Sequence, residues 1–268
     1  MEITRALHRN LTTPLPRRLN GVKTVWMRNF LQFRYTFWVT LTWIFFEPFL
    51  SLLAIGYGIG NYVSAINGKT YLEFYFPALL TVTSFSVPFF EATYNYYTKL
   101  THQKVYRTIL MTPIEPVEIL WAELLWAAFK GTISCIAVAL VGRFLNIYET
   151  WMIIPSIILL FLVSFIGAAF GLFFTTFAKN YDFFNYAVSG FLLPLSFFSD
   201  TYFPIIQMPN SIQIAIHYFP LIHGVHAVRY LLGIDTQHSL FISIAALFLF
   251  AGVSTRLAYS RFQQLLID

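Results

Sequence analysis

Apolar segments of membrane-spanning length recur along almost the whole of this chain of 268 residues. A helix needs about 20 predominantly apolar residues to cross the roughly 30 Å hydrocarbon core of a bilayer. Six segments approach or exceed this length: 36–60, 74–97, 117–141, 152–177, 183–199 and 238–257. Because 57% of the residues are hydrophobic and only 11% are charged, an ordinary soluble domain is excluded. The sequence therefore predicts an all-α polytopic membrane protein with six transmembrane helices.

Positive charge is divided unevenly among the segments that join these spans. Of the 17 lysines and arginines, 13 fall before the first span, after the second, after the fourth and from Arg256, at the end of the last span, onward. Three fall in the alternate segments, and Lys130 lies within a span. Short cytoplasmic segments retain Lys and Arg, so both termini are predicted to be cytoplasmic. The pI of 9.3 reflects this asymmetry and contact with anionic headgroups, and does not argue for nucleic acid binding.

The chain divides into a cytoplasmic segment at 1–35, a single transmembrane domain at 36–257 and the tail. Residues 1–18 read as an extended basic arm broken by Pro14 and Pro16. From 19 to 35, apolar residues recur at intervals of three and four with basic residues between them. This pattern is typical of an amphipathic helix in the membrane interface. A plain extension of the first span is the alternative.

Several short motifs suggest chemistry that the sequence does not support. Residues 67–70 read Asn-Gly-Lys-Thr, but a phosphate loop requires Gly where Val63 stands. His223 and His226 lack a neighbouring carboxylate or cysteine in zinc-site spacing. Cys135, the single cysteine, reads as a small buried residue. The chain is therefore predicted to be no enzyme, with no metal or nucleotide site of its own.

Four ionisable residues away from the ends of the predicted spans are candidate sites: Glu47, Glu91, Glu123 and Lys130. Charges inside a membrane are costly and mark functional or structural sites. At about 1.5 Å per residue, Glu47 and Lys130 lie roughly 16–20 Å deep, and the other two about 9–10 Å. Depth therefore favours Glu47 as the partner of Lys130. Two interpretations remain open: groups that line a translocation path or gate, and structural ion pairs.

The region before the last span is too apolar for an ordinary loop and too interrupted for one helix. Its interruptions are Pro194, Pro204, Pro209 and Pro220, and it contains Asp200 and Arg229. Irregular backbone at membrane depth must be covered by protein or line a wet cavity. We therefore expect short re-entrant or interfacial helices here, on the outer side.

Three regions of the chain carry recognisable motifs. The first is Phe46-Glu47-Pro48 running into Leu53-Ala54-Ile55-Gly56-Tyr57-Gly58-Ile59-Gly60. The second comprises residues 90–94, Tyr106-Arg107-Thr108-Ile109-Leu110-Met111-Thr112-Pro113, and 118–127. The third runs from Leu193 to Pro204 and closes with Met208-Pro209 and 220–229. In order and spacing they resemble the ABC-2 family of ABC-transporter permeases. The resemblance is closest to the lipo-oligosaccharide (nodulation-signal) exporters, and more distant to the daunorubicin-resistance permeases.

This resemblance implies a permease subunit of an ATP-driven exporter in the bacterial inner membrane. It implies an outer re-entrant hairpin and a cytoplasmic coupling helix, expected at 102–112. The expected contacts with the ATPase are Tyr106, Arg107, Leu110, Met111, Thr112, Pro113 and Lys179. ATP and Mg²⁺ would be bound by the partner, in a complex of two permease copies and two ATPase subunits. The substrate implied is amphiphilic or hydrophobic: a lipid-linked, oligosaccharide-bearing molecule or a drug.

Two features qualify this interpretation. The family more often has Ser-Gly where this chain has Ser199-Asp200. A proton-coupled secondary exporter of hydrophobic compounds is the alternative function, although no long internal repeat supports an inverted-repeat transporter.

Overall fold

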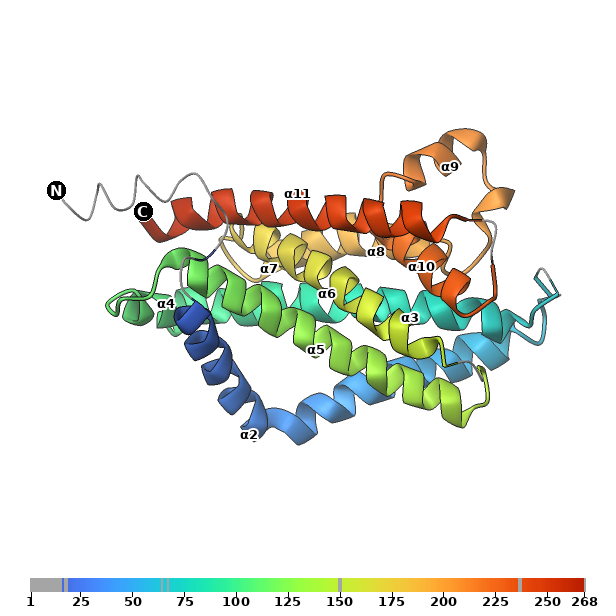
Figure 1. Ribbon diagram of the computed structural model, residues 1–268, viewed down its shortest axis with the longest axis horizontal. Coiled ribbons are helices and arrows are strands. Elements are labelled where there is room, and N and C mark those ends of the chain that lie inside the picture. Colours follow the sequence, from blue (N-terminus) through green and yellow to red (C-terminus); the bar gives the residue numbers. More distant parts are fainter. Residues whose placement is uncertain are drawn as a thin grey trace.

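The computed structural model describes residues 16, 19–63, 65–66, 68–148, 151–235 and 238–267, and every element within them is helical (Figure 1). The all-α class is therefore confirmed. The predicted basic arm lies outside the described residues except for Pro16.

The first helix combines the two alternatives that the sequence left open. Helix α2 runs without a break from Leu19 to Ser51 and continues as the π-helical segment η1, Leu52–Ile59. It bends by 43° between Thr40 and Ile44, so its two arms point in different directions. The change of direction comes later in the chain than the predicted boundary at residue 35.

The next helices form the centre of the bundle. Helix α3, Tyr71–Phe90, begins at a capping box between Thr70 and Glu73, and continues through two π-helical segments, η2 (Glu91–Asn95) and η3 (Thr98–His102). The short helix α4, Val105–Ile109, then leads through a turn to α5, Pro116–Phe144, and α6, Ile153–Thr175.

The last third of the chain alternates short and long helices. Segments α7 (Asp182–Ala187), η4 (Val188–Leu192) and α8 (Leu193–Phe197) follow one another directly. Short helices η5 (Ile205–Gln207), α9 (Asn210–Ile216) and α10 (Pro220–Leu231) come next. Helix α11, Leu240–Ile267, extends the last predicted span through most of the predicted tail.

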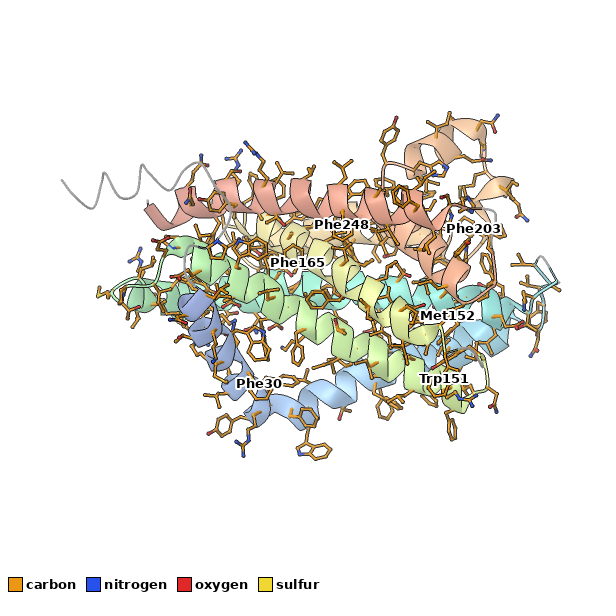
Figure 2. The ribbon with its side chains drawn as sticks, viewed as in Figure 1. Phe30, Trp151, Met152, Phe165, Phe203 and Phe248 are labelled. Atoms are coloured by element: carbon orange, nitrogen blue, oxygen red, sulfur yellow. The ribbon has the colours of Figure 1, made fainter. Side chains whose placement is uncertain are left out.

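Four helical stretches are long and apolar enough to cross a membrane, and a fifth is added if the two arms of α2 count as one span. The four stretches are Tyr71–His102, Pro116–Phe144, Ile153–Thr175 and Leu240–Gln264. The remaining predicted span, 183–199, corresponds to the broken run from α7 to α8, so a count of six stays a prediction. Large apolar side chains on outward faces, such as Phe248 at 64% exposure, suit lipid contact (Figure 2). The chain is an integral membrane protein.

The bundle has two distinct ends. Helix α4, the start of α2 and the last turns of α11 lie at one end, called here the α4 end. Helices α9 and α10 and the start of α3 lie at the other, the α9 end. By the charge rule applied to the sequence, the α4 end is the predicted cytoplasmic end.

Small residues allow α6 to approach α3 closely. A Cβ atom at Gly167 or Gly171 would collide with the backbone of Phe85 or Phe89. The small-residue spacing on this helix therefore serves packing within the chain. Gly56 behaves in the same way, because a Cβ there would collide with Leu72 of α3.

Candidate functional site

Two ion pairs join the extension of α3 to α5. The Lys130 ammonium lies 2.8 Å from a carboxylate oxygen of Glu91, and the Lys99 ammonium lies 2.8 Å from one of Glu123. Glu91 precedes Lys99 along one stretch and Glu123 precedes Lys130 along α5. Because the two stretches run antiparallel, the same order of charges on each gives two complementary pairs. We call this arrangement the charged register.

The π-helical segments of the α3 extension explain how both of its charges reach α5. Seven residues advance an α-helix by almost two full turns, so Glu123 and Lys130 share one face. Eight residues would overshoot two turns by about 80°. Glu91 and Lys99 are eight residues apart, but η2 fills the first half of this interval and η3 begins at Thr98, and their wider turns take up the extra residue.

The first pair is embedded in aromatic side chains and amides. Glu91 also accepts hydrogen bonds from the Asn95 amide at 2.7 Å and the Trp126 indole at 3.2 Å. The Lys130 ammonium lies 5.4 Å from the ring centroid of Phe33 on α2, within the range of a cation–π contact. Both charged side chains are mostly buried.

The predicted pairing of Lys130 with Glu47 is wrong. Lys130 pairs with Glu91, whereas Glu47 is exposed on the surface of α2. Depth along separate helices limits which residues can meet, but it does not fix which way each helix face points. That direction is set by the bend of α2 and by the packing of α3 against α5.

The second pair belongs to a buried network that joins four elements. The Lys99 ammonium donates to the Asn29 side chain of α2 at 3.1 Å, and the Tyr106 hydroxyl of α4 donates to Glu123 at 3.0 Å. Lys99 is only 2% exposed. Burial and the nearby Glu123 carboxylate raise the pKa of Tyr106, so its hydroxyl stays protonated and can donate. The network links η3, α2, α4 and α5.

Aromatic packing extends this network to the last helix. The rings of Tyr96 and Tyr106 stack with centroids 4.9 Å apart, and Tyr96 also packs on Phe262 of α11 at 5.7 Å. These contacts join α4 to α5 through Tyr106, and connect it with α11 through Tyr96 and with α2 through Lys99.

The residues expected at the ATPase contact separate into two groups. Arg107, Met111, Thr112 and Pro113 are exposed, and Leu110 is half-buried. Tyr106 is 1% exposed, so its expected place at the contact is wrong, and it forms the inner anchor of α4 instead. Lys179 is exposed in the loop after α6, and its carbonyl oxygen accepts a hydrogen bond from Tyr97 at 2.8 Å.

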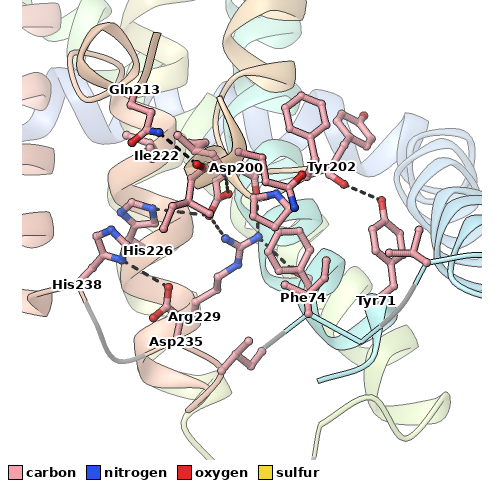
Figure 3. A pocket seen from close by; sticks show the side chains of 18 of the residues that line it. Tyr71, Phe74, Asp200, Tyr202, Gln213, Ile222, His226, Arg229, Asp235 and His238 are labelled. Atoms are coloured by element: carbon pink, nitrogen blue, oxygen red, sulfur yellow. Dashed lines mark hydrogen bonds and ion pairs between the residues drawn. The ribbon is translucent and has the colours of Figure 1, made fainter. Parts of the chain in front are cut away.

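At the α9 end, Asp200 and Arg229 form a buried ion pair (Figure 3). The Arg229 guanidinium also donates to the carbonyl oxygens of Asp200, at 2.6 Å, and Phe74, at 3.2 Å. The backbone N–H of Ile205 donates to the Asp200 carboxylate at 2.9 Å. Burial alone would raise the pKa of Asp200. The pKa is nevertheless held below its usual value by His226, Arg229 and the Ile205 N–H.

The backbone at Asp200 explains the departure from the family motif. Its φ is +61°, in the left-handed region that favours Gly and tolerates Asp better than most residues. The aspartate therefore keeps the turn and supplies a carboxylate to Arg229.

Two histidines continue this cluster toward α11. The rings of His226 and His238 stack with centroids 3.7 Å apart. His226 lies 3.7 Å from the Asp200 carboxylate, and His238 lies 3.4 Å from that of Asp235. Burial lowers the pKa of His226, which is therefore neutral at pH 7. Within the described residues no group of side chains is suited to hold a metal ion.

Three of the four prolines of this region start helices. Pro220 is in the first turn of α10, where a missing N–H has no cost. Pro194 instead lies within a continuous helical run, where η4 passes into α8. Pro204 and Pro209 occupy the cap positions of η5 and α9. The predicted interruptions therefore divide the region into short helices.

Comparison with known proteins identifies the family. The model of the ABC-2 type transporter family matches residues 20–233. The chain belongs to the ABC-2 type transporter family. It is therefore a membrane-embedded transport subunit, and the resemblance found from its motifs is confirmed.

Individual relatives point to one branch of this family. Nodulation protein J of Bradyrhizobium diazoefficiens is 27% identical over 80% of this chain and 82% of its own length. Nodulation protein J of Sinorhizobium fredii is 25% identical over 91% of this chain and 93% of its own length. Nodulation protein J of Rhizobium leguminosarum bv. trifolii is 25% identical over 76% of this chain and 78% of its own length. These matches agree with the nodulation-exporter branch of the resemblance.

Two residues of this ABC-2 subunit were missed by sequence reasoning. Lys99 was counted among the basic residues of a cytoplasmic loop, and Asn29 was not singled out. The antiparallel order of Glu91, Lys99, Glu123 and Lys130 is the signal that could have found Lys99.

Proposed function

We propose that this chain is the permease subunit of an ATP-driven exporter. Two copies would assemble with two ABC ATPase subunits, which bind ATP and Mg²⁺. The complex would move an amphiphilic or hydrophobic molecule outward from the cytoplasm or inner leaflet of a bacterial inner membrane. Membership of the ABC-2 family supports an ATPase partner.

The observation that carries this proposal is the buried network of Lys99, Glu123, Tyr106 and Asn29. A partner can shift a membrane domain only through surfaces that differ between two states. Helix α4 exposes Arg107, and the turn that follows it exposes Met111. On the inner side of α4, Tyr106 donates a hydrogen bond to Glu123. Closure of an ATPase dimer against the exposed outer side would be transmitted to α2 and α5 through the network.

The substrate is inferred from the relatives and from the surface of the chain. Resemblance to the nodulation-signal branch favours a lipid-linked molecule that carries an oligosaccharide. On the first arm of α2 and on α5, Trp26, Phe30 and Trp126 form an aromatic cluster, with ring centroids 5.6–6.5 Å apart. Phe30 is its exposed member, and Trp126 is buried. Aromatic side chains suit an interface where a ligand is partly apolar and partly wet.

Copurification and transport together test the proposal. The tagged permease should copurify with an ABC ATPase from its native membrane, and the complex in proteoliposomes should move an amphiphile only with ATP and Mg²⁺. A protonophore should leave this transport unchanged. Transport by the permease alone, abolished by a protonophore, would instead identify a proton-coupled exporter.

A further inference from the structure

A cavity of about 790 Å³ opens at the α9 end, far from the charged register. Its walls come from the segment after η1, the start of α3, the turn between α8 and η5, helix α10 and the segment before α11. Figure 3 shows side chains from these separate elements turned toward one space. The volume lies within the range of small-molecule sites.

The charged groups of this cavity are already paired with each other. Asp200 pairs with Arg229, and Asp235 lies 3.4 Å from His238. No Asp, Glu, Lys or Arg occurs between Asp200 and Arg229 in the sequence. An anion would meet two carboxylates, and a cation would have to displace their present partners. A ligand without formal charge avoids both costs.

The polar lining still has capacity for hydrogen bonds. The Arg229 side chain is 2% exposed and its Nε atom is buried, so hydrogen bonds to a ligand would come from polar side chains that are open to the cavity. Gln207 and His217 line the cavity and are exposed.

Ring surfaces stand beside these polar groups. Tyr71, Tyr202 and Phe203 line the cavity, and Phe203 is 37% exposed. Polar groups placed among apolar walls fix the orientation of a ligand. Sugar rings match this lining, because they carry hydroxyl groups at their edges and C–H groups on their faces.

We propose that this cavity binds the neutral, hydroxyl-rich head of the exported amphiphile, of the class of an uncharged sugar. The inference rests on the proposed function, in which the α9 end faces outward. A head held there after crossing would be kept from returning. Charged heads would bind more weakly, because an anion would meet the carboxylates of Asp200 and Asp235 and a cation would have to displace Arg229 or His238 from them.

Protection of a single introduced thiol tests this site. Cys135 is fully buried, so Gln207→Cys places one reactive thiol at the cavity, and Ser211→Cys places a matched exposed thiol on α9 outside it. Both full-length variants are placed in phosphatidylcholine nanodiscs and labelled with a maleimide. The probes are neutral disaccharides of glucose, galactose, mannose and N-acetylglucosamine, with glucuronic acid and glucosamine as charged controls. Alkyl glycosides below their micelle concentration represent lipid-borne sugars.

A neutral sugar should slow labelling at position 207 and leave labelling at position 211 unchanged. Protection by alkyl glycosides alone would assign the site to lipid-borne heads, and protection by free sugars as well would extend it to soluble ones. Phe203→Leu should raise the concentration that gives half protection about fivefold. Three results would each overturn the proposal. They are equal protection at both positions, protection by charged sugars as strong as that by neutral ones, and no protection by any neutral probe.

The failure of this site can be told apart from failure of the export function. Copurification with an ATPase is measured in the same preparations. Absent protection with the ATPase still bound would remove only the cavity as a sugar site. Protection without any ATPase partner would remove the proposed function and leave the cavity as a binding site.

Discussion

Glu91 and Lys99 lie eight residues apart on one helical stretch, and both of their side chains pair with α5. A regular α-helix would turn one of them away, and the π-helical segments η2 and η3 correct this by widening the turns. Such segments are frequent at functional sites, because they place side chains where regular helix geometry would not. Here they set the register on which α4 is anchored.

The pairing of Lys130 with Glu91 predicts a rescue. Lys130→Met should lower folded yield, because it leaves the Glu91 carboxylate unpaired at a depth where a charge costs at least about 2.5 kcal/mol. Adding Glu91→Gln should restore part of the yield. Size-exclusion yield from detergent extracts gives the comparison. Glu47→Gln is the control and should change the yield of the Lys130→Met variant no more than it changes that of the wild type, since Lys130 pairs with Glu91. Equal rescue by both would contradict the pair.

The anchor of α4 predicts a graded effect at Tyr106. Tyr106→Phe keeps the ring stack with Tyr96 and removes only the hydroxyl that donates to Glu123. A buried acceptor deprived of a donor costs about 1–3 kcal/mol. We expect a lower unfolding temperature and weaker stimulation of the ATPase, with the ATPase still bound. A variant that matches wild type in both measurements would show that the hydroxyl does not transmit the motion.

The outer face of α4 predicts the complementary result. Arg107→Ala with Leu110→Ala should uncouple ATP hydrolysis from transport and leave folded yield unchanged, because Arg107 is exposed and Leu110 half-buried. Hydrolysis and transport are measured in parallel in proteoliposomes. Arg143→Ala, an exposed arginine at the α9 end, is the control and should behave as wild type. Coupled transport in the double variant would place the ATPase contact elsewhere.

Much of the fold could be predicted from apolar length and charge, and the site only in part. The long apolar runs correspond to α3, α5, α6 and α11, because burial and membrane length leave a strong pattern. The pairing of charges could not be read in the same way, because it depends on helix rotation. Lys99 lies one residue out of α-helical phase with Glu91, so a regular helix model hides its partner. Asp200 shows the same limit, since a left-handed backbone leaves no periodic signal.

The histidines of the α9 end predict acid sensitivity. Burial lowers the pKa of His226 and of His223 below 6.5, so the folded state favours their neutral forms. The stability that the two neutral histidines contribute is present above about pH 6.5. It is lost as pH falls, because the unfolded state then binds more protons than the folded state. Asp200, whose pKa is lowered in the folded state, also contributes stability that is lost as pH falls, but only below about pH 3.8, the ordinary pKa of an aspartate.

Hydrogen exchange across 200–231 checks this expectation. Exchange corrected for its intrinsic pH dependence should be faster at pH 5.5 than at pH 7.5. His226→Gln should remove part of the difference, and His223→Gln with His226→Gln most of it. An undiminished difference in the double variant would assign the effect to other groups, such as His217 or His238, which face this pair.

The last prediction concerns the face between two copies. We expect it to be formed by the first span, the run from α7 to α8 and the first arm of α2. The closely spaced glycines Gly56 and Gly60 of the first span would allow a second copy to approach, but Gly56 packs against Leu72 within the chain. A stronger argument is Glu47, which is exposed beside the apolar side chains of Phe46 and Leu50. An exposed carboxylate facing lipid is costly, and a second copy would shield it.

Disulfide crosslinking measures this directly. Leu50→Cys, at a position 55% exposed, should crosslink two copies in native membranes with higher yield than Leu140→Cys on α5, at a position 64% exposed. The buried Cys135 contributes no background. Leu193→Cys on α8 should follow the Leu50 variant, because both lie on the proposed face. A higher yield for the α5 position would move the contact between copies to that helix and leave Glu47 to face the substrate.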